Sequence, residues 1–405
     1  MKGFSQYRWV VFAVLAAGGA ARAKAQLSQS TLMTDLNDYS SLTQDYNLVA
    51  LGNLTLGANG SDTQGGIAVE GTAAITGPWT IASDAPLNSD PTLFVNGQLT
   101  LSGGSSPVHL NNGYATLSTQ TGWSWSSSNP KTITGADGSV DINSSATHSN
   151  TDPISNPIPP GWNWSTESST LKSVSTSLAS QTSTSSDGSL MLQGQTLEFC
   201  TTATTGTVVF DLNASDFTNE NVPGLGNFTG IQVDVPTGVN YVINVTNITA
   251  GQTLFNVNFN SGSNDSNLLW NLEGPATGSE NVTLSNGGNI YGSILAPTIN
   301  LTENTIVNGQ IVSDNFTDDN SELHDDTFTP DQLLVPESPV FGLAALGLCA
   351  VAVGLPRLRR AMRSARLQPL DAARAAAVSW SLTRRRRLAL QARAALVPLA
   401  SSVSK

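Results

Sequence analysis

Apolar and small polar residues alternate from residue 281 to residue 312, and the alternation occurs twice. Each apolar residue or glycine of the first copy has a counterpart 17 positions later (299 − 282): Val282 and Ile299, Leu284 and Leu301, Ile290 and Val307, Gly292 and Gly309, Ile294 and Ile311. A period of two is typical of a strand with one buried face. A unit of this length has no room for both a helix and a strand, so the repeat predicts the stacked coils of a β-solenoid.

The same alternation of apolar and small polar residues extends over much of the chain and defines the expected fold. Strands are predicted over 45–56, 66–75, 93–101, 208–212, 231–235, 241–245 and 268–272. Within the intervening stretch 102–190, Leu171, Val174 and Leu178 form one apolar stripe, which predicts a helix over 166–181 capped by Ser165 or Thr166. We therefore expect an all-β fold, a parallel β-helix or solenoid over 45–328. A Ser/Thr-rich insertion at 102–190, with one helix, interrupts it.

Both ends of the chain have patterns of their own. Residues 1–25 combine a basic start, a short apolar run and an Ala-Lys-Ala sequence, as secretory signal peptides do, and a leader with a short helix or loop follows at 26–44. At the other end, a linker at 329–339 precedes an uncharged run at 340–356 and a basic tail at 357–405. The run is slightly shorter than the about 17 to 25 residues that span a bilayer. Because arginines follow it at once, we expect a transmembrane or sorting helix with the tail on the cytoplasmic side, disordered or partly helical.

Charge is segregated along the chain. Residues 26–337 contain two basic residues, Lys131 and Lys172, against 29 acids, a net charge of 2 − 29 = −27. From residue 357 onward there are 12 basic residues and one acid, a net charge of 12 − 1 = +11. A body this acidic excludes nucleic acid as a partner, because phosphate binding needs clustered Lys and Arg. The body contains a single cysteine, Cys200, so it has no internal disulfide framework.

Candidate catalytic residues do not form a pattern. Polysaccharide lyases and hydrolases with a β-helix need clustered carboxylates or basic residues on one face, and the body has only two basic residues. His109, His148 and His324 are far apart in sequence and have no metal-ligand spacing, so His324 is expected to make a structural hydrogen bond. We expect no enzymatic activity, with a polysaccharide-acting enzyme as an alternative.

The acids at the end of the body raise the question of a metal. Asp314, Asp318, Asp319, Asp325 and Asp326 offer the hard oxygen ligands that calcium prefers, but their spacing matches no known calcium loop. No cofactor is therefore expected, although calcium stays open.

Two further features allow more than one interpretation. The pairs Trp123–Trp125 and Trp162–Trp164 suit either stacking on sugar rings or pinning an irregular segment to the core, and we favour the second. A second alternative function, ice binding, needs a flat and regular threonine ladder. Thr283, Thr298 and Thr302 do not recur at a constant offset, so the sequence does not favour it.

Several motifs of the body occur together in one known family. They are Tyr46-Asn-Leu-Val-Ala-Leu-Gly-Asn-Leu-Thr-Leu56, Gly66-Ile-Ala-Val-Glu-Gly71, Leu269-Trp-Asn-Leu272, Ile290-Tyr-Gly-Ser-Ile-Leu-Ala-Pro297, Asn308-Gly-Gln310 and Glu322-Leu-His324. The chain resembles the choice-of-anchor A domain proteins of bacterial surfaces, which implies an adhesive, β-helical ectodomain. The resemblance assigns structural roles to Trp270, Asn271, Gly292, Leu295, Ala296, Pro297, Gly309 and His324.

The C-terminus resembles a PEP-CTERM sorting signal, with the motif Val335, Pro336, Glu337, then the apolar run, then arginines. This resemblance implies processing by an exosortase. The motif departs from the family because its second proline is displaced to Pro339, and 45 residues follow Arg360 (405 − 360). We expect a secreted, non-catalytic protein, anchored at the cell surface or held in the extracellular matrix, with an extracellular polymer or a host or matrix surface as its partner.

Overall fold

The computed structural model describes residues 29–331, except for gaps at 86–90, 103–107, 119, 129–130, 144, 146–147, 156–161, 182, 184–186, 264, 276–279, 286–287 and 319–320. The chain divides into two units, Met1–Leu334 and Val335–Lys405, and every described residue belongs to the first. The expected signal peptide, sorting motif, apolar run and basic tail lie outside the described residues. Among the described residues, no helix is long and apolar enough to cross a membrane.

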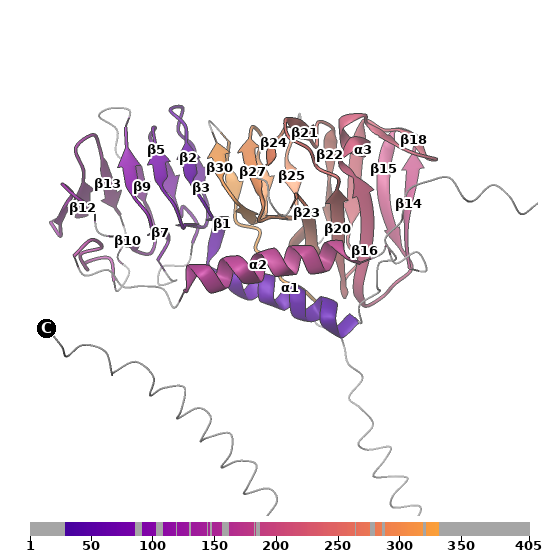
Figure 1. Cartoon of the computed structure of the whole chain (residues 1–405), viewed down its shortest axis with the longest axis horizontal. Helices are drawn as coiled ribbons and strands as arrows, with labels where there is room; N and C mark the ends of the chain where they lie inside the picture. The colour runs from indigo at the N-terminus through magenta and orange to yellow at the C-terminus, as the bar shows by residue number, and fades with distance from the viewer. Residues whose placement is uncertain are drawn as a thin grey trace, which may run out of the picture. The chain divides into compact units, whose positions relative to one another are not determined.

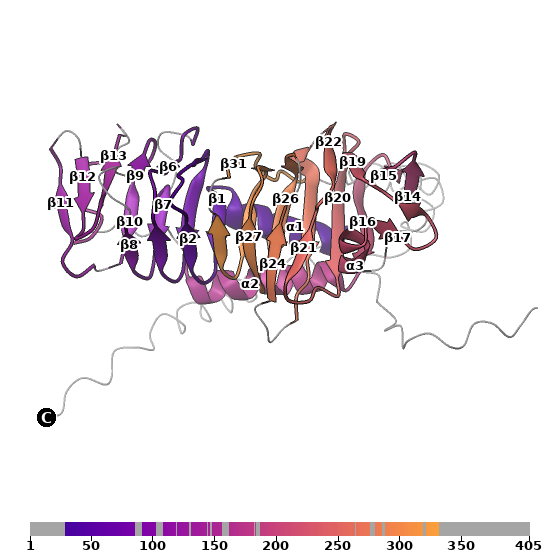
Figure 2. The same ribbon diagram turned by 90° about the horizontal axis from the view of Figure 1, so that it is seen from above.

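Three long sheets surround one core, and this arrangement confirms the predicted β-solenoid (Figures 1 and 2). Sheet A has the strand order β10 (Ala115–Leu117), β7 (Leu93–Val95), β4 (Gly66–Val69), β1 (Tyr46–Ala50), β29 (Ile311–Ser313), β26 (Ser293–Ala296), β23 (Leu268–Leu272), β20 (Val239–Thr246) and β16 (Gly206–Asn213). Sheet B has the order β21 (Gln252–Leu254), β24 (Glu280–Leu284), β27 (Ile299–Glu303), β30 (Phe316–Asp318), β2 (Leu54–Leu56), β5 (Ala73–Ile75) and β8 (Leu99–Leu101). Sheet C has the order β11 (Ser124–Ser126), β12 (Lys131–Thr134), β13 (Ser139–Ile142), β9 (Val108–Leu110), β6 (Thr80–Ile81), β3 (Asp62–Thr63), β31 (Leu323–His324), β28 (Val307–Asn308) and β25 (Ile290–Tyr291).

A smaller sheet, sheet D, lies at one end of the solenoid (Figure 1). Its order is β14 (Gly188–Gln193), β15 (Thr196–Thr201), β19 (Gly230–Asp234) and β22 (Asn258–Ser263). The short helix α3 (Ala214–Thr218), the pair β17 (Asn221–Val222) and β18 (Gly226–Asn227), and the 3₁₀ turn η1 (Asp265–Asn267) complete the described elements of this half.

The coils do not follow one another in sequence from end to end. The first strand, β1, lies in the middle of sheet A, between β4 and the late strand β29. The chain coils outward from β1, returns along the solenoid, and then coils from β16 back to β31, where it meets its own start (Figure 1, indigo beside orange). The pairs β1–β29, β2–β30 and β3–β31 join these two halves, and we call this junction the seam.

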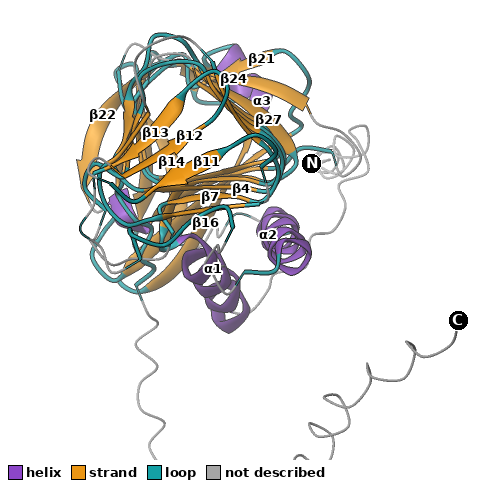
Figure 3. Ribbon diagram, turned by 90° about the vertical axis from the view of Figure 1, so that its left-hand side faces the viewer, coloured by secondary structure: helices purple, strands orange, loops and turns teal. Residues whose placement is uncertain are grey.

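Two helices cover the outer surface of sheet A, as the end-on view shows (Figure 3). They are α1 (Gln29–Thr43) and α2 (Trp164–Ala179), and their apolar side chains form a second buried cluster with the outer residues of sheet A. Sheet A is therefore buried on both faces. This explains why strands such as β1 and β23 are almost continuously apolar instead of alternating.

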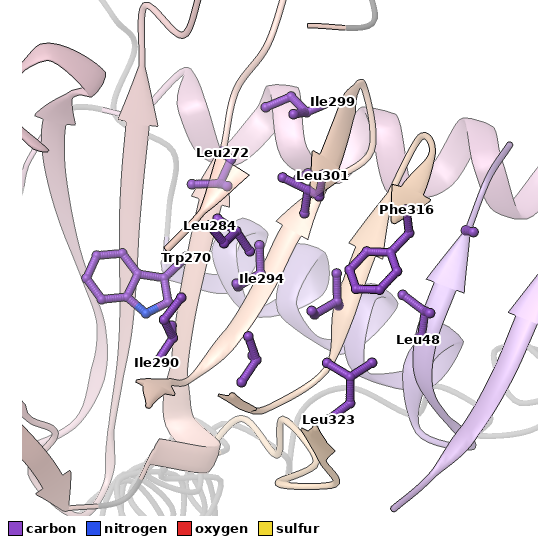
Figure 4. Packing of buried hydrophobic residues seen from close by; sticks show 14 of the residues in the cluster. Leu48, Trp270, Leu272, Leu284, Ile290, Ile294, Ile299, Leu301, Phe316 and Leu323 are labelled. Carbon is purple, nitrogen blue, oxygen red and sulfur yellow. The ribbon is translucent and has the colours of Figure 1, made fainter. Parts of the chain in front are cut away.

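The main core fills the solenoid with the inward residues of successive coils (Figure 4). The second part of the paired repeat stacks at the predicted offset of 17, with Ile290 beside Val307 and Ile294 beside Ile311. Its first part is shifted by two residues, because Val282 lies beside Leu301 and not beside Ile299. Burial of these ladders stabilises the body, whose single cysteine is free, by about 25 cal/mol for each Å² of apolar surface.

Three details differ from the sequence prediction. The expected helix begins at Trp164, and Asn163, not Ser165 or Thr166, caps it by accepting the Thr166 N–H. The leader, expected as a short helix or a loop, forms the 15-residue helix α1, and the described residues contain three α-helices where one was expected in the body. Part of the expected insertion belongs to the solenoid, because β9, β10 and β13 pair in sheets A and C. Short strands separated by polar loops carried too few aliphatic residues for the sequence pattern to reveal them.

Candidate surface-binding site

One outward position of sheet B is a threonine in six of its seven strands. The register places Thr253 beside Thr283, Thr283 beside Thr302, Thr302 beside Thr317, Thr317 beside Thr55, Thr55 beside Ala74, and Ala74 beside Thr100. We call this line of residues the threonine row. Because neighbouring strands lie about 4.8 Å apart, the row extends roughly 29 Å with a constant repeat.

The alternation of strand residues explains why the row faces solvent. In β2 and β27 the residues on either side of the threonine are buried, while Thr55 is exposed and Thr302 is half-buried. Sheet A cannot offer such a face, because α1 and α2 cover it (Figure 3). Sheet B thus presents methyl and hydroxyl groups in a regular line.

A second line of outward residues runs beside the first, two positions earlier in each strand or in the turn before it. Asn281, Asn300, Asn315 and Asn53 form this asparagine row. Asn300 Nδ2 donates to Asn281 Oδ1 at 2.9 Å, and Asn315 Nδ2 donates to Asn300 Oδ1 at 2.6 Å. Neither row contains an ionisable side chain, although the body has a large negative charge.

Two acids lie directly beneath this face. Glu303 on β27 and Asp318 on β30 are register partners with fully buried side chains. Burial first, and then the nearby Asp318 carboxyl, raises the pKa of Glu303 well above its usual range. Among the described residues, neither carboxyl oxygen of Glu303 receives a hydrogen bond, whereas the Ser321 N–H donates to Asp318 Oδ1 at 2.9 Å.

The acids considered for calcium are dispersed. Asp318 lies in the core of sheet B, Asp325 follows β31 in sheet C, and Asp319 lies outside the described residues. Near Asp326, burial and the neighbouring acids raise the pKa of Asp265 to about 6. No group of three or more His, Cys, Asp or Glu side chains in the described part of the chain is arranged to hold a metal.

The three histidines lie in separate places. His109 is on β9, and its ring lies 3.4 Å from the Asn143 amide. The His148 ring packs 5.2 Å from Tyr114. His324 contacts Asn308 at 2.6 Å and Glu322 at 3.1 Å, so its ring nitrogens link neighbouring polar side chains of sheet C.

The tryptophan pairs contact protein aromatic residues or the core. Trp162 lies 5.1 Å from Tyr46, and Trp164 stacks on Phe94 at 5.2 Å, between α2 and sheet A. Trp123 and Trp125 pack against the core from the end strand β11. These contacts agree with the second interpretation of the tryptophan pairs, in which they attach irregular segments to the core.

The motif residues of the body lie in and around the last coils. The indole of Trp270 faces the core and donates to the Tyr291 carbonyl at 2.8 Å (Figure 4), whereas Asn271 faces α2 and donates to the Ser175 carbonyl at 2.9 Å. Gly292 and Gly309 both have positive φ, and a Cβ at Gly309 would lie 2.5 Å from the Gly292 carbonyl oxygen. Leu295 packs under the helices and Ala296 in the main core, and the buried Pro297 leads into β27.

Comparison with known proteins supports a surface-binding class. The model of a family described as a putative ice-binding-like adhesive domain matches residues 39–325, and the chain belongs to this family. No curated protein matches the chain.

Solved structures of ice-binding proteins are similar to the chain at low scores. An ice-binding protein from an Arctic yeast has 11% identity and a TM-score of 0.33, covering 74% of this chain and 99% of its own. One from the ascomycete Antarctomyces psychrotrophicus has 10% identity and a TM-score of 0.27, covering 71% and 96%. At these scores the fold assignment rests on the strand registers described above.

The threonines of the row do not recur at a constant offset along the chain, so the row is not visible as a repeat in the sequence. Thr283 and Thr302 are 19 positions apart (302 − 283), and Thr302 and Thr317 are 15 apart (317 − 302), yet all three are register partners. The loops between coils differ in length while the strands stay aligned. A useful signal would have been a threonine between two inward residues, as in Leu54-Thr-Leu56 and Val282-Thr-Leu284.

Proposed function

We propose that this protein is a secreted, non-catalytic adhesin that binds ice through the outer face of sheet B. The threonine row carries the proposal, because it repeats one methyl and one hydroxyl group at a fixed distance along a rigid sheet. A crystal surface also repeats its groups at fixed distances. A rigid face that already matches such a surface loses little conformational entropy on binding.

Two properties of the face support ice over other surfaces. Neither row contains an aromatic side chain that could stack on sugar rings, and neither contains a charge that could recognise an ionic surface. The membership in an adhesive family supports attachment as the purpose of the binding.

The test is ice-affinity partition and thermal hysteresis of the purified protein and two variants. Thr302→Tyr places a bulky ring in the middle of the threonine row and should lower binding about tenfold or more, a difference of about 1.4 kcal/mol. Thr80→Tyr makes the same change on β6 of sheet C and should leave binding unchanged. Absence of ice binding by the unmodified protein would refute the proposal.

A matrix polymer is the second candidate ligand, supported by the amide groups of the asparagine row, which can exchange hydrogen bonds with a hydroxyl-rich chain. Saturable binding to isolated matrix polysaccharide without cleavage, lost in Thr302→Tyr, would favour it. Cleavage of the polysaccharide would instead favour an enzyme.

Delivery to the cell surface through the N-terminal signal and the sorting motif Val335–Glu337, with exosortase processing and a choice-of-anchor A type of attachment, is part of the proposal. Its test is the intact mass of the protein from native cells. Loss of residues before Gln26 and after about Pro336, with recovery from the outer surface, is expected. A membrane-bound species that retains Lys405 would refute sorting.

A further inference from the structure

The threonine row is assembled from two distant parts of the chain. Thr253, Thr283, Thr302 and Thr317 come from the late coils, and Thr55, Ala74 and Thr100 come from the early coils. The two groups meet where Thr317 pairs with Thr55, at the seam. No covalent link joins β30 to β2 locally, so the alignment of the two halves depends on noncovalent contacts there.

An unbroken chain of amide hydrogen bonds crosses the seam beside this junction. The Thr72 N–H donates to Asn53 Oδ1 at 2.8 Å, and the Asn53 N–H donates to Asn315 Oδ1 at 2.7 Å. Asn315 Nδ2 then donates to Asn300 Oδ1, and Asn300 Nδ2 donates to Asn281 Oδ1. The Asn315 side chain therefore connects the backbone of the early half with the asparagine row of the late half.

Two glycines leave the space that these amides occupy. A Cβ at Gly52 would lie 2.6 Å from Asn315 Oδ1, and a Cβ at Gly71 would lie 2.5 Å from Asn53 Oδ1. A larger residue at either position would displace the amide and would also meet backbone, because a Cβ at Gly52 would lie 2.9 Å from the Asp314 carbonyl oxygen and one at Gly71 2.6 Å from the Gly52 carbonyl oxygen. The sequence thus combines glycine and asparagine at the corner of successive coils, and the two residue types depend on each other.

We propose that Asn315 is a positioning residue that, together with the strand pairs of the seam, locks the two halves of the threonine row into one register. With the two halves in one register, a single ice surface can contact both halves of the threonine row at once. If the halves slipped out of this register, each would offer only a short row, and a ligand that spans the seam would lose the second set of contacts. The functional consequence rests on the proposed ice binding, whereas the lock itself does not.

The experiment compares the full-length protein with four variants. Asn315→Ala removes the bond across the seam, and Gly52→Ala displaces the same amide by another route. Asn315→Asp keeps an acceptor for the Asn53 N–H but loses the donor to Asn300. Asn300→Ala is the matched control, because it removes amide bonds only within the late half.

Two quantities are measured for each variant. Hydrogen exchange of the Phe316 N–H, which donates to the Asn53 carbonyl at 2.9 Å, reports on the seam. Exchange of the Leu301 N–H, which bonds to the Asn315 carbonyl within the late half, serves as the internal reference. Ice-affinity partition reports on the binding face.

Asn315→Ala and Gly52→Ala should each accelerate Phe316 exchange about 3- to 10-fold, the loss expected for one hydrogen bond, and should weaken ice binding. The double variant should lose no more than Gly52→Ala alone, because that change already displaces the amide and adds the contact with the Asp314 carbonyl. Asn315→Asp should keep slow Phe316 exchange, and Asn300→Ala should match the unmodified protein at the seam.

If the Phe316 N–H exchanged at the same rate in Asn315→Ala and in Asn300→Ala, the proposal that Asn315 locks the seam would be wrong. Accelerated exchange with unchanged ice binding would overturn its role in positioning the face. If the unmodified protein does not bind ice, the proposed function fails, and the exchange data still decide whether the lock exists.

Discussion

Glu303 and Asp318 lie side by side on neighbouring strands inside the solenoid, directly beneath Thr302 and Thr317. The body contains only two basic residues, Lys131 and Lys172. Two adjacent carboxylates cannot both remain charged in a dry core. Burial, and then the Asp318 carboxyl, raises the pKa of Glu303 well above its usual range, whereas Asp318 Oδ1 accepts the Ser321 N–H.

This pair makes stability depend on pH in a direction opposite to that of most surface acids. The pKa of Glu303 is raised in the folded state above its ordinary value of 4.5, so above about pH 4.5 the folded protein binds more protons than the unfolded chain. The free energy of unfolding should therefore fall as pH rises from about 4.5 through the raised pKa.

Glu303→Gln tests this prediction, because glutamine keeps the shape of the protonated acid without a proton to lose. Unfolding midpoints in urea should be similar for both proteins near pH 4 and higher for Glu303→Gln at pH 7. The change Glu70→Gln, at a partly exposed glutamate after β4, should leave the pH dependence of the unmodified protein intact. If the unfolding midpoint of Glu303→Gln changed with pH in the same way as that of the unmodified protein, the pH dependence would not come from Glu303.

Ala74 is the one interruption of the threonine row, between Thr55 and Thr100. Its side chain is half-buried and faces outward, and a β-branched residue suits a strand. Ala74→Thr should extend the regular hydroxyl line and raise ice affinity about 2- to 5-fold, a gain typical of about 0.5–1 kcal/mol per hydrogen bond. Ala74→Lys, which adds a charged side chain at the same place, should lower it. Partition of both variants into growing ice gives the comparison, and a gain with lysine would show that the row is not the contact surface.

The sequence predicted the class of fold because the paired repeat at 281–312 contains its complete inward ladder. It did not predict the position of the seam, because the pairing of Leu54 with Phe316 joins segments about 260 residues apart (316 − 54 = 262) and leaves no local pattern. On strands of sheet B such as β2 and β27, alternation indicates which residues point outward. Which outward threonines become neighbours depends on loop lengths, and these vary between coils.

Helix α1 was left open as helix or loop for a similar reason. Its buried residues, such as Leu36 and Tyr39, acquire their partners only when sheet A exists, and Tyr39 packs edge-on against the distant Phe328 at 5.5 Å. The tertiary contacts therefore decide the helix more than its own sequence does.

Asn271 attaches α2 to sheet A, and its removal should destabilise the protein. Its Nδ2 donates to the Ser175 and Asn244 oxygens, and its Oδ1 accepts from the Ser175 hydroxyl at 2.7 Å, all in a buried place. Asn271→Ala leaves these groups without a partner and should cost about 1–3 kcal/mol of unfolding free energy. Urea titration measures the loss, with Asn256→Ala at an exposed loop position as the control. Equal midpoints for the two variants would show that the buried amide contributes nothing to holding α2.

Gly309 combines two constraints that no other residue can meet. Its φ of +154° is rare for residues with a side chain, and a Cβ would lie 2.5 Å from the Gly292 carbonyl oxygen, which belongs to the adjacent coil. Gly309→Ala should therefore force the two coils apart and lower the unfolding free energy by about 1–3 kcal/mol, the usual cost of such backbone strain. Gly288→Ala is a matched control, because φ is not positive there and the nearest atoms are more than 4 Å from the added carbon. Thermal unfolding should show a lower midpoint for Gly309→Ala and an unchanged or slightly higher one for Gly288→Ala, since alanine restricts the unfolded chain. If both variants unfold at the same temperature, the close stacking of Gly292 and Gly309 does not limit the approach of the coils.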